Sequence, residues 1–170
     1  MSAQPIPGLA AVLRDGRQYV LDSVQGLTED QASKKPAPGR WSVLECMEHI
    51  AIVEDRFYGW ILNGTENAPE KSWERETKLF TMATDRSYKV QAPEAVVPTG
   101  RFATLQEAVA EFEKFRDRTM QLANDKGVEL YSIGATHPRF GEMNGSDVMN
   151  LMAAHARRHA DQILETREAL

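Results

Sequence analysis

Residues 41–62 read WSVLECMEHIAIVEDRFYGWIL, and this stretch decides the fold class. Ser42 and Glu45 have the spacing of a capping box, in which each side chain accepts a hydrogen bond from the other residue's backbone N–H. Apolar residues then recur every three or four positions, as they do on the buried face of a helix. Asn63 and Gly64 end this pattern. The stretch therefore predicts one long helix that packs against others.

The same periodicity predicts three more long helices. The first runs from about Gly8 to Gln25, the third from Thr104 to Ala123, and the fourth from Ser146 or Asp147 toward the end of the sequence. Alternation of apolar and polar residues, which would indicate strands, is scarce. We therefore expect an all-α fold, a four-helix bundle with a long crossover between helices two and three.

The connections are of four kinds. A short helical turn is expected at Thr28, which has capping-box spacing to Gln31. Residues 70–83 predict a shorter helix, and residues 88–102, with two prolines, predict an extended crossover. Residues 127–145 contain several glycines and a proline, so we expect a loop there.

Composition bounds the class of protein and its partners. The chain has 170 residues, 42% of them hydrophobic and 26% charged, which is typical of one globular domain over residues 1–170. The formal charge is −5 and the basic residues are dispersed. We therefore expect neither a nucleic acid nor a membrane as a partner, because both select clustered lysine and arginine.

Cysteine usage and hydropathy predict the cellular compartment of the protein. Cys46 is the single cysteine, which excludes an internal disulfide and suits a reducing compartment. The N-terminal residues lack a basic region followed by a long apolar run, and no stretch approaches the roughly 18 apolar residues of a membrane span. We expect a cytoplasmic protein.

The candidate chemistry is concentrated in the histidines. His155 and His159 are four residues apart, so their side chains lie one helical turn apart and can bind one ion together. His49 lies at the edge of the apolar face of the second helix and can supply a third ligand. Neutral imidazole binds divalent metal ions; we rank zinc first, with nickel, manganese or iron as alternatives. Packing roles without metal remain the alternative for all three.

Two further polar residues accompany these histidines. Gln162 lies one turn after His159, where it can orient a ligand or instead bond a backbone carbonyl. His137 precedes a proline in the loop, and we expect it to have a positional role.

No catalytic residue is identified from the sequence. Glu45 is explained by the capping box, and Cys46 is expected in the core. Glu48 lies about 100° around the helix from His49, so we expect it to be solvated. The carboxylates of the connection between helices two and three have no expected position; these are Glu70, Glu74, Glu76 and Asp85.

Three stretches together carry a family resemblance: RWSVLECMEHIA at residues 40–51, HPRFGE at 137–142 and HARRHADQI at 155–163. In order and spacing they resemble the DinB/YfiT-like family of metalloenzymes, over nearly the whole chain. The resemblance implies a four-helix bundle, a homodimer, and a divalent metal ion held by His49, His155 and His159.

Two readings of the function follow from this resemblance. It implies a metal-dependent enzyme acting on a small molecule, either a hydrolase or an S-transferase that uses a low-molecular-weight thiol. The alternative is a non-catalytic dimeric bundle with a structural or sensing site for a metal or ligand, or a family member that binds no metal. An enzyme requires a metal face open to solvent, whereas a structural site is closed by a fourth protein ligand.

Overall fold

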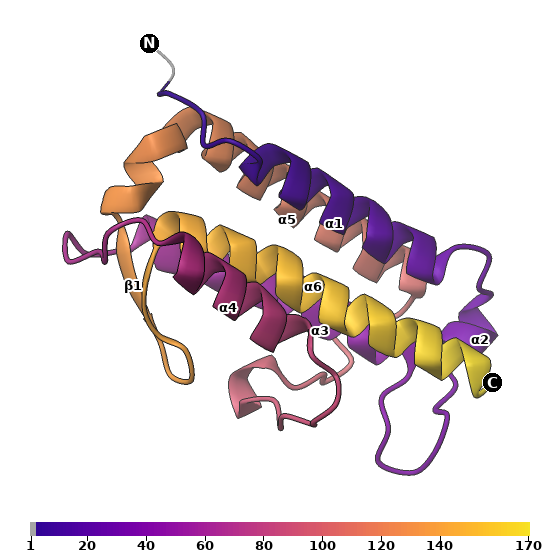
Figure 1. Ribbon diagram of the computed structural model, residues 1–170. Helices are drawn as coiled ribbons and strands as arrows, with labels where there is room; N and C mark the ends of the chain where they lie inside the picture. Colours follow the sequence, from indigo (N-terminus) through magenta and orange to yellow (C-terminus); the bar gives the residue numbers. More distant parts are fainter. Residues whose placement is uncertain (1–2) are drawn as a thin grey trace.

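Four long helices form a bundle in the computed structural model, which describes residues 3–170 (Figure 1). The expected domain at residues 1–170 includes residues 1–2, which lie outside the described residues. The bundle helices are α1 (Leu9–Val24), α3 (Val43–Leu62), α5 (Leu105–Lys126) and α6 (Gly145–Glu168). The expected all-α four-helix bundle is confirmed, with the addition of one small hairpin.

The first and last helices of the bundle run side by side in the same direction (Figure 1). The Tyr19 hydroxyl donates a hydrogen bond to the Asp161 carboxylate, with 2.5 Å between the oxygens. Further along both helices, Arg167 Nη1 donates to the carbonyl of Ser23 at 2.8 Å. Such a parallel pair requires the long connections found elsewhere in the chain.

The connection between α3 and α5 is the expected long crossover. It contains α4 (Trp73–Thr84), which packs on α6, and a short 3₁₀ helix, η1 (Glu94–Val96). The α4 helix begins three residues later than expected, because Ser72 caps it by accepting a hydrogen bond from the Arg75 N–H at 3.1 Å. The short α2 helix (Glu29–Ser33) connects α1 to α3.

Capping boxes begin four of the helices. Those expected at Thr28, Ser42 and Thr104 are confirmed, with both reciprocal hydrogen bonds present. A fourth, between Asn144 and Asp147, begins α6 one or two residues earlier than expected. Gly145 reads as a helix breaker, but here it is required because a Cβ atom would lie 2.9 Å from the Leu130 carbonyl oxygen.

The segment expected as an irregular loop has regular structure. It consists of a 3₁₀ helix, η2 (Gly127–Ser132), and an antiparallel hairpin of β1 (Gly134–His137) and β2 (Gly141–Asn144). Each strand has only four residues, which is too short for an alternating pattern to stand out in the sequence. The hairpin projects from one end of the bundle (Figure 1).

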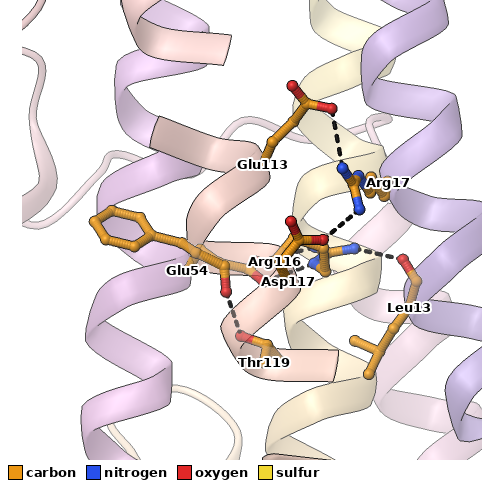
Figure 2. Close-up of polar contacts among 8 residues, drawn as sticks. Leu13, Arg17, Glu54, Glu113, Arg116, Asp117 and Thr119 are labelled. Atoms are coloured by element: carbon orange, nitrogen blue, oxygen red, sulfur yellow. Dashed lines mark hydrogen bonds and ion pairs between the residues drawn. The ribbon is translucent and has the colours of Figure 1, made fainter. Parts of the chain in front are cut away.

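The bundle core contains one buried ion pair as well as apolar side chains. Arg116 Nε and Nη2 donate to the two carboxylate oxygens of Glu54 at 2.6 and 2.9 Å, and Arg116 Nη1 donates to the Leu13 carbonyl at 2.8 Å (Figure 2). The pair therefore ties α3, α5 and α1 together. Over residues 3–170, no helix combines the length and the hydropathy needed to cross a membrane.

Candidate metal centre

Three histidines from two helices meet in the bundle. His49 comes from α3, and His155 and His159 come from α6, which packs beside α3. One ring nitrogen from each lies within 4.8 Å of the other two, and His49 Nε2 is 3.0 Å from His155 Nε2. The capping box that begins α3 fixes the position of His49 on the inward face. The structure thus brings together the three residues that the sequence singled out.

Hydrogen bonds on the outer ring nitrogens set the orientation of two of these rings. His49 Nδ1 donates to the carbonyl oxygen of Val96 at 2.7 Å, and His159 Nδ1 donates to the Gln162 side-chain oxygen at 2.8 Å. A proton held at Nδ1 leaves the lone pair of a neutral imidazole on Nε2. Metal-ligating histidines have this arrangement in proteins, so the donor set fits a divalent ion.

Burial keeps the three imidazoles in the neutral form that binds metal. The pKa of His49 is lowered by desolvation, which outweighs the hydrogen bond to Val96. Desolvation also lowers the pKa of His155 and His159 well below 6.5, and the neighbouring histidines lower both further. Near pH 7 all three are therefore unprotonated and available as ligands.

Aromatic rings surround the histidines on several sides. The Trp41 ring stacks on His159 at a centroid distance of 6.2 Å and lies 5.0 Å from His49. The Phe57 ring lies 6.2 Å from His155. His49 is buried, whereas His155 and His159 remain partly exposed. The site is therefore lined by apolar groups, with partial exposure at His155 and His159.

Glu48 was expected to be solvated, and this prediction is wrong. Only 1% of its surface is exposed. Its carboxylate accepts hydrogen bonds from the backbone N–H groups of Thr99, Gly100 and Arg101 at 2.7–3.2 Å, and from the Arg101 guanidinium at 2.8 Å. Helical periodicity in α3 gives no sign that the crossover returns over this face. Glu48 anchors the same segment whose Val96 carbonyl orients His49.

Two other residues singled out in the sequence lie outside the cluster of ring nitrogens. Cys46 is fully buried, and desolvation raises the pKa of its thiol to about 12, so it behaves as a core residue. His137 ends β1 and its Nδ1 accepts hydrogen bonds from the backbone N–H groups of Arg139 and Phe140 at 3.0 and 3.2 Å. His137 thus has the expected positional role, closing the hairpin turn.

The carboxylates add no ligand. Glu45 has the capping role predicted for it, since it accepts from the Ser42 N–H at 2.8 Å. Within residues 3–170, no carboxylate joins the three-histidine cluster. Sequence reasoning missed the Val96 carbonyl, because a backbone oxygen has no sequence signature. The site that results has three neutral nitrogen donors and, among the described residues, no fourth His, Cys or carboxylate ligand.

Comparison with known proteins identifies the family. The family model described as the DinB superfamily matches residues 13–163. The chain belongs to the DinB superfamily. The match runs from within α1 to within α6 and includes all three histidines, and it confirms the resemblance drawn from the sequence motifs.

Relatives of this DinB-superfamily chain share its length and fold. YuaE of Bacillus subtilis (strain 168), an uncharacterized protein, is 24% identical over 161 residues, which cover 94% of this chain and 98% of YuaE. The solved structure of YfiT from Bacillus subtilis has a TM-score of 0.60 at 14% identity, covering 98% of this chain and 93% of YfiT. YfiT is described as a probable metal-dependent hydrolase with an unusual four-helix bundle topology. The four-helix bundle protein TT2238 has a TM-score of 0.52 at 19% identity, covering 95% of this chain and 97% of its own.

Proposed function

We propose that this chain is a metal-dependent enzyme acting on a small molecule, with a divalent ion held by His49, His155 and His159. The reaction is hydrolysis or the transfer of a low-molecular-weight thiol. YfiT, which shares the fold, is described as a probable metal-dependent hydrolase, and this supports the proposal. We also propose zinc as the first candidate ion. We propose in addition that the chain forms a homodimer, and light scattering measures the mass that tests this.

The observation that carries the proposal is the convergence of three ring nitrogens within 4.8 Å of one another. Apolar side chains would stabilise the fold better than neutral imidazoles brought together in a partly dry site. Folding alone therefore does not explain the cluster. The Val96 carbonyl and the Gln162 side chain also hold two of the rings in the tautomer that metal ligation requires.

The lack of a fourth His, Cys or carboxylate ligand among the described residues favours catalysis over a closed structural site. Structural zinc sites have four protein ligands, whereas catalytic sites keep a position for water or substrate. Neither His137 nor Cys46 joins the cluster, and His155 and His159 retain partial exposure. This argues against the alternative of a non-catalytic bundle with a closed site.

The chemistry that a divalent ion supplies in such a site is Lewis-acid catalysis, which lowers the pKa of water or of a thiol. The chain's own groups have supporting roles. Gln162 and the Val96 carbonyl orient the imidazoles, and Trp41 and Phe57 exclude water from the flanks. Hydrolysis and thiol transfer require the same site and differ in the nucleophile that enters it.

Elemental analysis of protein purified without chelator tests the proposal. We expect one divalent ion per chain, lost in His49→Ala and His155→Ala while circular dichroism shows that the helices remain. His137→Ala is the matched histidine control and retains the ion. Absence of metal after reconstitution with zinc, nickel, manganese and iron, or equal loss in all three variants, contradicts the proposed ligand set.

Substrate screens of the loaded protein then separate the two reactions. Hydrolysis of activated esters and amides without added thiol identifies a hydrolase. Consumption of an electrophile only when a low-molecular-weight thiol is present identifies a transferase. The His155→Ala variant is inactive in either assay if the ion is required.

A further inference from the structure

Two arginines from distant segments share one aromatic neighbour near the three-histidine site. Arg158 lies on α6 between His155 and His159, and Arg139 lies in the turn of the hairpin. Both guanidinium groups lie over the ring of Tyr88, with centroid distances of 5.7 Å for Arg158 and 5.0 Å for Arg139. The fold therefore brings two positive charges from distant segments to one aromatic ring.

Contacts through Phe57 place the hairpin turn beside the histidines. The His137 ring, two residues before Arg139, lies 6.0 Å from the Phe57 ring. The Phe57 ring also lies 6.2 Å from the ring of His155. Arg139 thus projects from a segment that shares a packing partner with one of the proposed metal ligands.

Tyr88 is a fixed platform for the two cations. Its hydroxyl donates to the carbonyl of Met82 at 3.0 Å, and its own carbonyl accepts from Arg158 Nη2 at 2.8 Å. Arg158 Nη1 donates to the carbonyl of Asp85. These bonds use two of the five guanidinium N–H groups of Arg158 and leave the others free.

Neither cation is paired with a carboxylate. Within the described part of the chain, the Arg139 and Arg158 guanidinium groups make no salt bridge, and the Arg139 side chain has no hydrogen-bond partner. Arg86, which lies nearby, is satisfied by both carboxylate oxygens of Glu165 at 2.6 and 2.8 Å. The Asp85 carboxylate instead accepts from the Ser87 N–H at 2.8 Å.

The local charge balance is positive. Arg86 is offset by Glu165, whereas Arg139 and Arg158 have no ion-pair partner among the described residues. The three imidazoles contribute no negative charge, and a divalent ion would add two positive ones. The two guanidinium groups lie 5.0 and 5.7 Å from the Tyr88 centroid, so they repel each other, and an anion that contacts both offsets this repulsion through charge-assisted hydrogen bonds.

We propose that Arg139 and Arg158 form an anion subsite above Tyr88, so that the substrate carries a carboxylate or phosphate group distinct from the group that reaches the metal. This inference rests on the proposed function, because it requires an ion at the three histidines. It narrows the substrate class to small molecules with at least two polar ends, one of them anionic. Arg158 belongs to the H-x-x-R-H stretch, and this subsite gives that arginine a role beyond anchoring the crossover.

Binding of anions to the Co²⁺-loaded protein tests the subsite without an activity assay. The visible bands of Co²⁺ report ligand exchange at the ion. We compare titrations with butyrate, which has one carboxylate, succinate, which has two, and 3-phosphonopropionate, which has a carboxylate and a phosphonate. We expect the two dianions to bind at least about tenfold more tightly than butyrate. The tighter of the two identifies the anion, and either order supports the subsite.

Arg139→Gln is the decisive variant, because Arg139 is exposed and anchors nothing. We expect it to remove most of the advantage of the dianions while Co²⁺ affinity and butyrate binding are unchanged. Arg158→Gln is expected to act in the same direction, but it also loosens the segment around Tyr88. Arg157→Gln is the matched control, since Arg157 is the next residue on α6 and lies over Tyr19 instead, at 4.7 Å.

The outcomes separate this inference from the proposed function. If Co²⁺ binds and succinate shows no advantage over butyrate, or keeps its advantage in Arg139→Gln, the subsite is overturned and the metal site stands. If Co²⁺ does not bind to the wild-type chain, the metal site and the subsite both fail.

Discussion

Single hydrogen bonds decide how two of the three histidines present their nitrogens. The partner of His49 is a backbone carbonyl, that of Val96, whereas the partner of His159 is the side chain of Gln162. Only the second partner can be removed by a substitution. Gln162 therefore offers the most direct test of ring orientation.

Gln162→Leu is expected to weaken metal binding by about tenfold to a hundredfold without unfolding the chain. Leucine has nearly the same size but cannot accept the Nδ1 proton of His159, so the ring is free to rotate or change tautomer. Competition with a metallochromic dye measures the affinity. Gln121→Leu, at an exposed position on α5, serves as the control and leaves the affinity unchanged. Equal affinity in the two variants would reduce Gln162 to a packing residue.

At the scale of elements, the crossover is part of the site rather than a passive connection. Glu48 on α3 binds three consecutive backbone N–H groups of the crossover, beginning at Thr99. Three residues earlier, the Val96 carbonyl accepts the Nδ1 proton of His49. Glu48, which holds this segment in place, is therefore adjacent in sequence to His49, which donates a hydrogen bond to it.

Glu48→Gln is expected to lower the free energy of unfolding by about 1–3 kcal/mol, because the amide presents N–H groups to backbone N–H donors. Metal affinity is expected to fall with it, since the Val96 carbonyl loses its anchor. Urea denaturation and dye competition measure the two effects. Glu129→Gln, at an exposed position, changes neither. A loss of stability with unchanged metal affinity would show that the crossover does not orient His49.

The buried pair of Arg116 and Glu54 joins three helices (Figure 2). We expect Arg116→Met to lower the free energy of unfolding by about 3–5 kcal/mol, because it leaves a buried carboxylate without a partner. The double variant Glu54→Leu with Arg116→Met is expected to recover most of this loss. Urea denaturation of the four chains in the cycle measures both. Lys114→Gln, which removes an exposed ion pair with Glu111, is expected to lower the free energy of unfolding by less than about 1 kcal/mol. A double variant no more stable than Arg116→Met would contradict this account.

The sequence predicts elements well where the signal is local. Capping boxes at Ser42 and Thr104 and the periodic apolar positions were sufficient for the long helices. The spacing of His155 and His159 likewise placed both on one face of α6. The hairpin was missed because its strands are short, and the burial of Glu48 was missed because it depends on a segment 51 residues away in sequence.

At the scale of the whole molecule, the histidines couple stability to pH. In the folded chain the pKa values of His155 and His159 lie well below 6.5, mainly because of desolvation, whereas in the unfolded chain they are near 6.5. Below pH 6.5 the unfolded chain therefore binds more protons than the folded one. The free energy of unfolding must then fall as the pH falls through this range.

We expect the free energy of unfolding of the metal-free protein to fall by up to about 1.4 kcal/mol per histidine for each pH unit below 6.5. Urea denaturation in chelator at pH 7.5 and 5.5 measures this slope. A chain with His155→Gln and His159→Gln is expected to show a flatter profile, because neither position titrates. The carboxyl groups whose pKa is lowered, Asp85 and Glu165, affect stability only at more acidic pH. An equal slope in both chains would contradict the assignment to these histidines.

The parallel pairing of α1 with α6 also constrains how the protein is made. Of the elements described, α6 is the last to leave the ribosome, and it covers α1, α3 and α4 at once. A nascent chain that lacks α6 exposes the apolar sides of these helices and carries only His49 of the three histidines. The triad is therefore assembled as a late step of maturation, after a period in which the incomplete bundle exposes apolar surface that favours aggregation.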